Sequence, residues 1–180
     1  MIRKIVTLVA GIVCVIAAQA QSYSPVDDSS KVSFTIKNLG INVKGSFTGL
    51  QGHITFDAAQ PENSSFDVYI DAASINTGNN ARDNHLREEV FLDVQNHPHI
   101  KFVSVKVEPG KKAGTFFMQG TLTIKGISLP LSFPFTVTPT TDGYWLEGDF
   151  DTRRKPYRVG RTSTISDKLT VSLRVLVKKT

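Results

Sequence analysis

Cysteine is almost missing from this chain of 180 residues, which contains a single one, Cys14. Cys14 lies inside an apolar stretch near the N-terminus, Ile5 to Ala18, and not in the body of the sequence. The remainder of the chain can have neither a disulfide framework nor a cysteine nucleophile. Its fold must therefore depend on a hydrophobic core.

The sequence also has no apolar run as long as the ~20 residues that a membrane-spanning helix needs. The stretch from Ile5 to Ala18 follows Arg3 and Lys4 and leads into Ala18-Gln19-Ala20, the pattern of a secretory signal peptide with its cleavage site. An uncleaved anchor is the alternative. We expect residues 1–20 to be removed, a mature chain that begins near Gln21, one domain over residues 21–180, and a periplasmic or secreted protein.

A strong charge of one sign is absent as well. The chain has 21 basic and 16 acidic side chains, and its formal net charge is +5. Most basic residues are scattered among acidic ones, so a nucleic acid is not an expected partner. The one dense basic cluster runs from Arg153 to Arg161 and is interrupted by Tyr157.

What the sequence has in abundance is alternation of apolar and polar residues. From Ile127 to Val137 the odd-numbered residues are apolar and the even-numbered ones are polar or proline, and Leu169 to Val177 repeats this period of two. Such alternation is typical of strands with one buried face. Turn signals such as Pro109-Gly110 and Lys125-Gly126 separate the runs. The pattern predicts an all-β fold of about eight long antiparallel strands, joined as an up-and-down barrel.

Irregularities in the alternation predict local features of this barrel. The phase changes between Phe102 and Val103, which predicts a β-bulge there. Pro130 and Pro134 cannot donate to a sheet ladder, so we expect their strand to be interrupted or to lie at a seam. Three glycines in the segment 42–57 indicate bends in one long strand: Gly45, Gly49 and Gly52.

Residues 80–92 break the period of two. Leu86, Val90 and Phe91 would share one side of a helix, whereas the charged residues would not, so a short amphipathic helix is predicted near residues 80–92. This segment is either a lid over the barrel or a crossover connection that packs Leu86 and Phe91 into the core. The residues alone leave both interpretations open.

The order of residues in this segment resembles the signature of the YceI-like polyisoprenoid-binding family. The positions that carry the resemblance are Arg82, Asp83, His85, Leu86, Phe91, Asp93, Pro98 and Phe102. Further segments in the same order are similar to the family pattern, among them Val43-Lys44-Gly45-Ser46-Phe47, residues 73–78 and residues 120–126. The resemblance extends over nearly the whole mature chain.

The resemblance implies an extended eight-stranded, lipocalin-like barrel whose hydrophobic tunnel holds a long isoprenoid lipid, such as a polyprenyl phosphate or an isoprenoid quinone. No other cofactor is expected. Six apolar residues of the long strands are our candidates for lining the tunnel: Phe34, Phe47, Phe102, Leu122, Phe133 and Phe135. The helical segment with Arg82, Asp83, His85, Leu86 and Phe91 is the candidate lid.

The basic cluster is the candidate head-group site. Guanidinium groups bind phosphate through paired N–H donors, so a phosphate head could be held by Arg153, Arg154, Arg158 and Arg161 if this loop lies at the barrel mouth. The alternatives are a solvated loop and transient contact with an anionic membrane surface.

Catalysis and metal binding are weaker interpretations. Arg82, Asp83 and His85 are not accompanied by a nucleophile or a paired carboxylate, so no catalytic residue is assigned. His97 and His99 lack a further well-placed ligand, so no metal site is assigned. The alternative to a lipid carrier is a non-catalytic, packed barrel, an interaction or stress-related module that acts at a membrane or partner surface. A homodimer remains open.

Overall fold

The computed structural model describes residues 21–160 and 164–180. The signal peptide expected over residues 1–20 and the head-group candidate Arg161 lie outside the described residues. The strands of the described part are β1 (Gln21–Pro25), β2 (Lys31–Asn38), β3 (Ile41–Phe47), β4 (Gln51–Phe56), β5 (Ser65–Asp71), β6 (His99–Pro109), β7 (Thr115–Ile124), β8 (Ile127–Pro139), β9 (Gly143–Arg153) and β10 (Ile165–Lys179). One α-helix, α1 (Asn80–Arg87), lies between β5 and β6.

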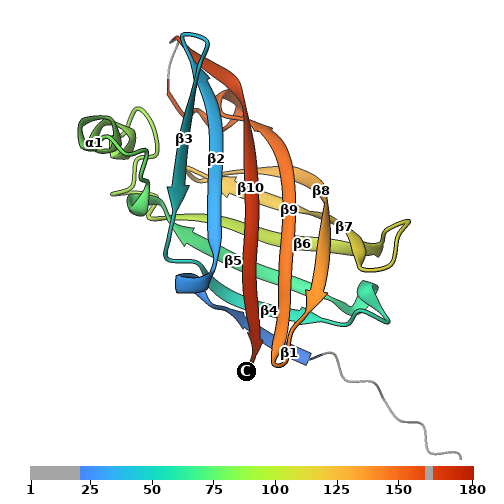
Figure 1. Ribbon diagram of the computed structural model, residues 1–180. Helices are drawn as coiled ribbons and strands as arrows, with labels where there is room; N and C mark the ends of the chain where they lie inside the picture. The colour runs from blue at the N-terminus through green and yellow to red at the C-terminus, as the bar shows by residue number, and fades with distance from the viewer. Residues whose placement is uncertain (1–20, 161–163) are drawn as a thin grey trace, which may run out of the picture.

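The strands form a closed antiparallel barrel (Figure 1). Neighbouring strands pair in chain order from β4 to β10, and β10 then pairs with both β1 and β2 along one edge. Because β1 also pairs with β4, and β2 with β3, the first four segments act as two long, bent strands. The expected all-β barrel of eight antiparallel strands with one short helix is therefore confirmed.

The two bends are tied to each other. The break between β1 and β2 is the 3₁₀ turn Asp27–Ser29, and the break between β3 and β4 contains Gly49, whose φ of 73° favours glycine. The Asp27 carboxylate accepts hydrogen bonds from the backbone N–H groups of Gly49, at 2.9 Å, and Leu50, at 2.8 Å. A single side chain thus satisfies the donors that the second bend leaves unpaired.

The alternation seen in the sequence sets which residues point inward. On β8, Leu131, Phe133, Phe135 and Val137 are buried, while the polar residues and prolines between them are exposed. The same phase holds along β10, where Val177 is fully buried. The period of two therefore predicted both the strands and their inner faces correctly.

Pro130 and Pro134 do lie at a seam. Val137 N donates to Gly114 O toward β7, and because N–H groups alternate sides along a strand, the two prolines face β9. Their strand is continuous, but β8 and β9 pair only from Thr136 onward. Between residues 127 and 135 the β8 edge that faces β9 therefore has no paired neighbour among the described strands.

The expected bulge exists at a different position. The register of β6 and β7 shifts between Ser104 and Lys106, so the extra residue is Val105, which is 79% exposed, and not the pair Phe102 and Val103. Val103 is apolar but lies on the outer face of β6. The sequence alternation therefore changed at Val103, although the strand itself is irregular only two residues later.

Helix α1 is shorter than the predicted segment 80–92. Asn79 caps its N-terminus, with the side chain accepting from Arg82 N at 3.0 Å, and the helix ends at Arg87. Turns follow as far as residue 96. Arg87 then fastens the helix to the barrel by donating to the carbonyl oxygens of Ala73, at 2.7 Å, and Ile75, at 2.9 Å. Across the described residues, no helix combines the length and the apolar character that crossing a bilayer would need.

Candidate functional site: an apolar cavity at one end of the barrel

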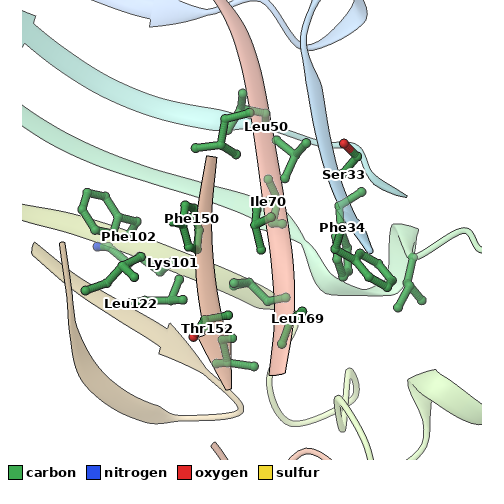
Figure 2. A pocket seen from close by; sticks show the side chains of 18 of the residues that line it. Ser33, Phe34, Leu50, Ile70, Lys101, Phe102, Leu122, Phe150, Thr152 and Leu169 are labelled. Carbon is green, nitrogen blue, oxygen red and sulfur yellow. The ribbon is translucent and has the colours of Figure 1, made fainter. Parts of the chain in front are cut away.

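The barrel interior is not filled along its whole length. A cavity of about 300 Å³ lies in the half of the barrel nearer to α1 and the β2–β3 hairpin. All ten strands contribute residues to its lining, although β1 contributes only Pro25. Figure 2 shows that the labelled carbon-rich side chains of β2, β5, β6, β7, β9 and β10 surround a common space. Nearly all of the atoms that face it are apolar.

Strand β10 shows where the filled interior gives way to the cavity. Its inward residue Val177 has no exposed surface, because it sits among the aromatic residues of the closed end. Farther along the same inner face, Leu169, Val171, Leu173 and Val175 are only partly buried, and all four line the cavity. Inward aliphatic side chains of β10 are thus fully packed at the closed end and only partly packed beside the cavity. Such incomplete packing indicates a hollow interior, because protein cores are normally close-packed.

All six residues predicted to line a tunnel lie on this cavity. Phe34 and Phe47 pack against each other at its open side, with ring centroids 5.7 Å apart. Phe102 contacts Phe133 at 5.8 Å. Leu122, Phe133 and Phe135 are less than a tenth exposed and also belong to the packed core, so they form the floor of the cavity.

The helical segment contributes to the cavity mouth through three of its five candidate residues: Arg82, Leu86 and Phe91. Phe91 is buried and packs edge-on against His85, with ring centroids 4.8 Å apart. His85 itself is exposed and its Nδ1 lies 2.8 Å from Glu88 Oε2. His85 therefore braces the segment rather than facing the cavity.

Arg82 and Asp83 do not form the charge pair that their adjacency favours; among the described ion pairs, none joins them. Both bind Thr77 instead. Asp83 is buried and accepts from the Thr77 N–H, at 2.9 Å, and from its hydroxyl. Arg82 Nε donates to Thr77 Oγ1 at 2.7 Å, and its Nη2 donates to Thr77 O at 2.9 Å. The segment is thus fixed to the β5–α1 connection by neighbouring residues of opposite charge.

The basic cluster divides into residues with different surroundings. Arg153 lines the cavity, its side chain is 73% exposed, and its only described ion pair is to Asp167 at 3.8 Å. Arg158 is exposed and has a φ of 56°, and it borders a shallow surface hollow together with Lys125 and Lys155. These side chains are free enough to meet a ligand from solvent.

Arg154 is different because it is 5% exposed. Its guanidinium donates to three carbonyl oxygens, those of Val159 at 2.8 Å, Ser166 at 3.0 Å and Ile165 at 2.8 Å. Donors on all three guanidinium nitrogens, Nε, Nη1 and Nη2, thus hold the loop together. A head-group role for Arg154 stays a prediction, and these three contacts are to backbone carbonyl oxygens.

Tyr157 is the apolar anchor of the same loop. Its side chain is 2% exposed, and burial raises the pKa of its hydroxyl, an effect that a hydrogen bond with Thr152 partly opposes. Together with Arg154, Tyr157 makes this loop a rigid rim beside the cavity.

The two neighbouring histidines point to different partners. His97 Nε2 lies 3.8 Å from Asp93 Oδ2, whereas the His99 ring packs on Tyr69 with centroids 4.5 Å apart. In the parts of the chain that the structure describes, no three His, Cys, Asp or Glu residues gather as metal ligands would.

Sequence reasoning did not identify Thr77, Arg87 or the half-buried row of β10 as parts of this site. Thr77 contacts Arg82 and Asp83, and Arg87 donates to backbone carbonyl oxygens. Contacts of this kind leave no regular spacing of residues in the sequence. The β10 row was correctly placed on the inner face, but whether inward residues meet other side chains or a cavity depends on the width of the barrel.

A closed antiparallel barrel of eight strands with an apolar cavity is the architecture of lipocalin-like barrels, whose interior has room for one small ligand. The YceI-like domain model matches residues 23–177. The chain therefore belongs to the YceI-like domain family, and the family resemblance noted in its sequence is confirmed.

Individual relatives agree with this assignment. The chain is 36% identical over 135 residues to the UPF0312 protein of Pseudomonas savastanoi pv. phaseolicola, covering 72% of this chain and 69% of that protein. The crystal structure of Burkholderia cenocepacia BcnA superposes with a TM-score of 0.78 at 24% identity, covering 83% of this chain and 96% of the other. A polyisoprenoid binding domain from Saccharophagus degradans, implicated in plant cell wall breakdown, gives 0.71 at 14% identity, covering 89% and 99%. The last two likenesses concern the fold alone.

Proposed function

We propose that this protein carries or stores a long isoprenoid lipid, either a polyprenyl phosphate or an isoprenoid quinone, inside its barrel. The observation that carries the proposal is the unfilled apolar cavity, lined by Phe34, Phe47, Phe102, Leu122, Phe133 and Phe135. Each buried CH₂ of a ligand contributes ~0.8 kcal/mol, so a prenyl chain that replaces water there gains affinity without polar contacts. That the Saccharophagus degradans domain is called polyisoprenoid binding supports the choice of ligand class.

Polar groups at the mouth would orient the lipid. Arg82 and Arg153 both line the cavity, and Arg158 lies in the adjoining rim loop. We assign the head group to this side, where the guanidinium of Arg153 is exposed and weakly paired. A phosphate would gain charge-assisted hydrogen bonds from it, whereas the carbonyl of a quinone would gain less.

The helical segment fits a role as a fixed side of the mouth better than a moving lid. Arg87 and the Thr77 contacts of Arg82 and Asp83 attach it at several points. Its Leu86 and Phe91 would contact the ligand chain.

The alternative of a packed interaction barrel without a small ligand is disfavoured by the half-buried inner row of β10. Folded proteins rarely leave apolar interior space unfilled. We also propose that the protein works in the periplasm or outside the cell, on the strength of the sequence pattern of residues 1–20.

The direct test is native mass spectrometry of the mature protein purified from its own periplasm, followed by organic extraction of what it carries. A stoichiometric prenyl lipid is the expected result. A bare protein mass that also fails to shift with added polyprenyl phosphate or quinone would overturn the proposal.

A matched pair of variants shows whether the cargo lies inside the barrel. Val171→Phe adds bulk on the inner face of β10, and Ser172→Phe adds it on the exposed outer face of the next residue. We expect the first to lower lipid stoichiometry and the second to leave it unchanged. Equal retention of lipid by both would place the cargo elsewhere.

The head-group assignment has a separate test. Arg153→Gln should weaken binding of polyprenyl phosphate and spare quinone, because only the phosphate uses the guanidinium charge. Equal loss for both ligands would remove Arg153 from the head-group site.

A further inference from the structure

The tip of the β2–β3 hairpin carries two large aliphatic side chains in solvent. Leu39 is 73% exposed and Ile41 is 71% exposed. Single exposed aliphatic residues are ordinary on protein surfaces, but two within three residues at the end of a hairpin form a small apolar point.

The conformation of the turn makes the choice of leucine costly. Asn38 pairs with Ile41, so the loop has two residues, and both have positive φ, 49° at Leu39 and 81° at Gly40. This is the pattern of a type I′ turn, which strongly favours Asn-Gly. A leucine with positive φ is strained, and at this position it also exposes an apolar side chain. Departures from local rules tend to concentrate at functional sites.

The tip lies at the mouth of the cavity. Ile36, Asn38 and Val43 of the hairpin line the cavity. Leu39 N donates to Thr164 O at 3.2 Å, which extends the pairing of β2 with β10 to the tip. Figure 1 shows the hairpin at one end of the barrel, whereas β1 and the C-terminus lie at the other end. Whatever this tip touches is therefore next to the opening through which a lipid would enter.

The hairpin itself carries charge of one sign, and the nearest acidic residue on the neighbouring strand, Asp167, is paired with Arg153. Lys37 and Lys44 flank the tip on exposed positions of β2 and β3, and residues 31–56 contain no acidic side chain. Exposed Arg153 and Arg158 lie in the rim loop on the same end. Lysine and arginine beside an apolar tip complement an anionic bilayer, where head groups meet the cations and aliphatic side chains enter the acyl boundary.

We infer that the β2–β3 hairpin tip docks this protein on anionic membranes, with Leu39 and Ile41 entering the bilayer interface and Lys37 and Lys44 contacting the head groups. The inference rests on the proposed lipid-carrier function and gives it a site of loading. Two aliphatic side chains provide only weak, reversible attachment, which suits a carrier that must leave the membrane with its cargo.

Membrane docking and hairpin stability predict opposite effects for one substitution. Leu39→Asn restores the preferred Asn-Gly turn, so it should raise the thermal stability of the protein. Combined with Ile41→Thr, which keeps a β-branched residue in the strand, it removes the apolar tip. If Leu39 served only the folding of the hairpin, its replacement by Asn would not raise thermal stability and at the same time weaken membrane binding.

The experiment is flotation of the mature protein with vesicles of phosphatidylglycerol and phosphatidylethanolamine, and in parallel with vesicles of phosphatidylcholine alone. The wild type should bind the anionic vesicles, and added salt should weaken this binding. Leu39→Asn with Ile41→Thr should lower the partition coefficient by about tenfold. Lys37→Gln with Lys44→Gln should lower it on anionic vesicles and remove most of its salt dependence.

The matched control is Val105→Thr. Val105 is 79% exposed, as apolar as the tip residues, and lies on the outer wall at the β6 bulge. This variant should bind vesicles as the wild type does. Equal loss in Val105→Thr and in the tip variant, or undiminished binding by the tip variant, would overturn the inference; the second result would favour a protein partner for the tip.

Cargo binding is measured separately, by mass shift with detergent-solubilised polyprenyl phosphate. The tip variants should keep this shift, because Leu39 and Ile41 do not line the cavity. If the wild type does not bind polyprenyl phosphate, the carrier function is rejected. If the wild type binds polyprenyl phosphate but not the vesicles, only the docking site is rejected.

Discussion

The two ends of the barrel are built from the same kind of strand but reach opposite results. At the closed end, beside the C-terminus, Tyr23, Phe56 and Tyr144 pack with ring centroids 5.3 Å apart in each contact, and Val107 and Val177 have no exposed surface. At the open end, Phe34 packs on one aromatic ring within the described part of the chain, that of Phe47. Three aromatic residues that meet can close a barrel, whereas aliphatic rows without such partners leave room for a ligand.

The largest expected contrast comes from removing one ring at each end. Phe56→Ala should lower the free energy of unfolding by about 3 to 5 kcal/mol, because Phe56 contacts Phe66, Phe116 and Tyr144 and would leave a cavity in a filled core. Phe34→Ala should cost about 1 kcal/mol, since its ring already borders empty space. Urea denaturation measures both, and equal losses would mean that the two ends are packed alike.

The rim of the open end offers a second contrast, between adjacent arginines. Arg154→Met should destabilise the protein by about 2 to 4 kcal/mol, because it removes a buried guanidinium that donates to the partly buried carbonyl oxygens of Val159, Ile165 and Ser166. Arg153→Gln should stay within about 0.5 kcal/mol, as is usual for an exposed residue. Thermal unfolding of the two variants measures both effects. A large effect of Arg153→Gln would contradict the conclusion that Arg154 has a structural role and Arg153 does not.

Alkaline pH should weaken the packing of the closed end around Tyr23. Burial, and next a hydrogen bond with Tyr144, raises the pKa of Tyr23 from 10.0 to about 12. Between these values the unfolded tyrosine loses its proton and the folded one keeps it. The stabilising contribution is therefore complete below pH 10 and is lost as the pH rises toward 12, by about 2 to 3 kcal/mol.

Urea denaturation at several pH values between 9 and 12 measures this loss, and Tyr23→Phe is the control. The variant should show a shallower decline, with Tyr157, whose pKa is also raised, contributing what remains. An identical decline in the variant and the wild type would show that Tyr23 is not the group responsible.

At Gly45, on the open end, a substitution should affect lipid binding more than stability. A Cβ at Gly45 would lie 2.4 Å from Cζ of Phe34, so Gly45→Ala should displace that ring toward the cavity at a cost of less than about 1 kcal/mol. The narrower cavity should lower lipid affinity by roughly fivefold, which corresponds to about 1 kcal/mol. Titration with a polyprenyl phosphate tests it, and adding Phe34→Leu should restore affinity by returning the space.

Much of the fold follows from the period of two. It predicted the inner faces of β8 and β10, because pleating forces successive side chains to opposite faces. The seam at Pro130 and Pro134 followed from the missing proline N–H, and the bend at Gly49 from the freedom of glycine at positive φ. Gly45 and Gly52, which were expected to mark further bends, lie within β3 and β4. The bulge was placed wrongly because Val103 is apolar yet faces outward, and the helix was predicted too long because the turns after Arg87 bury Phe91 and Leu92 without helical backbone. Both errors come from equating apolar residues with inward or helical positions.

The sequence by itself therefore determined the closed all-β barrel, the inward faces of its long strands and the helical segment beside them, since these depend on local alternation. Only the tertiary structure decided that the interior is filled at one end and hollow at the other, that Arg154 holds backbone carbonyls while Arg153 meets solvent, and that Leu39 and Ile41 stand at the mouth. Those features depend on which side chains from distant strands meet across the barrel. The width of the barrel decides this, and it is fixed by strand number and stagger rather than by any short stretch of sequence.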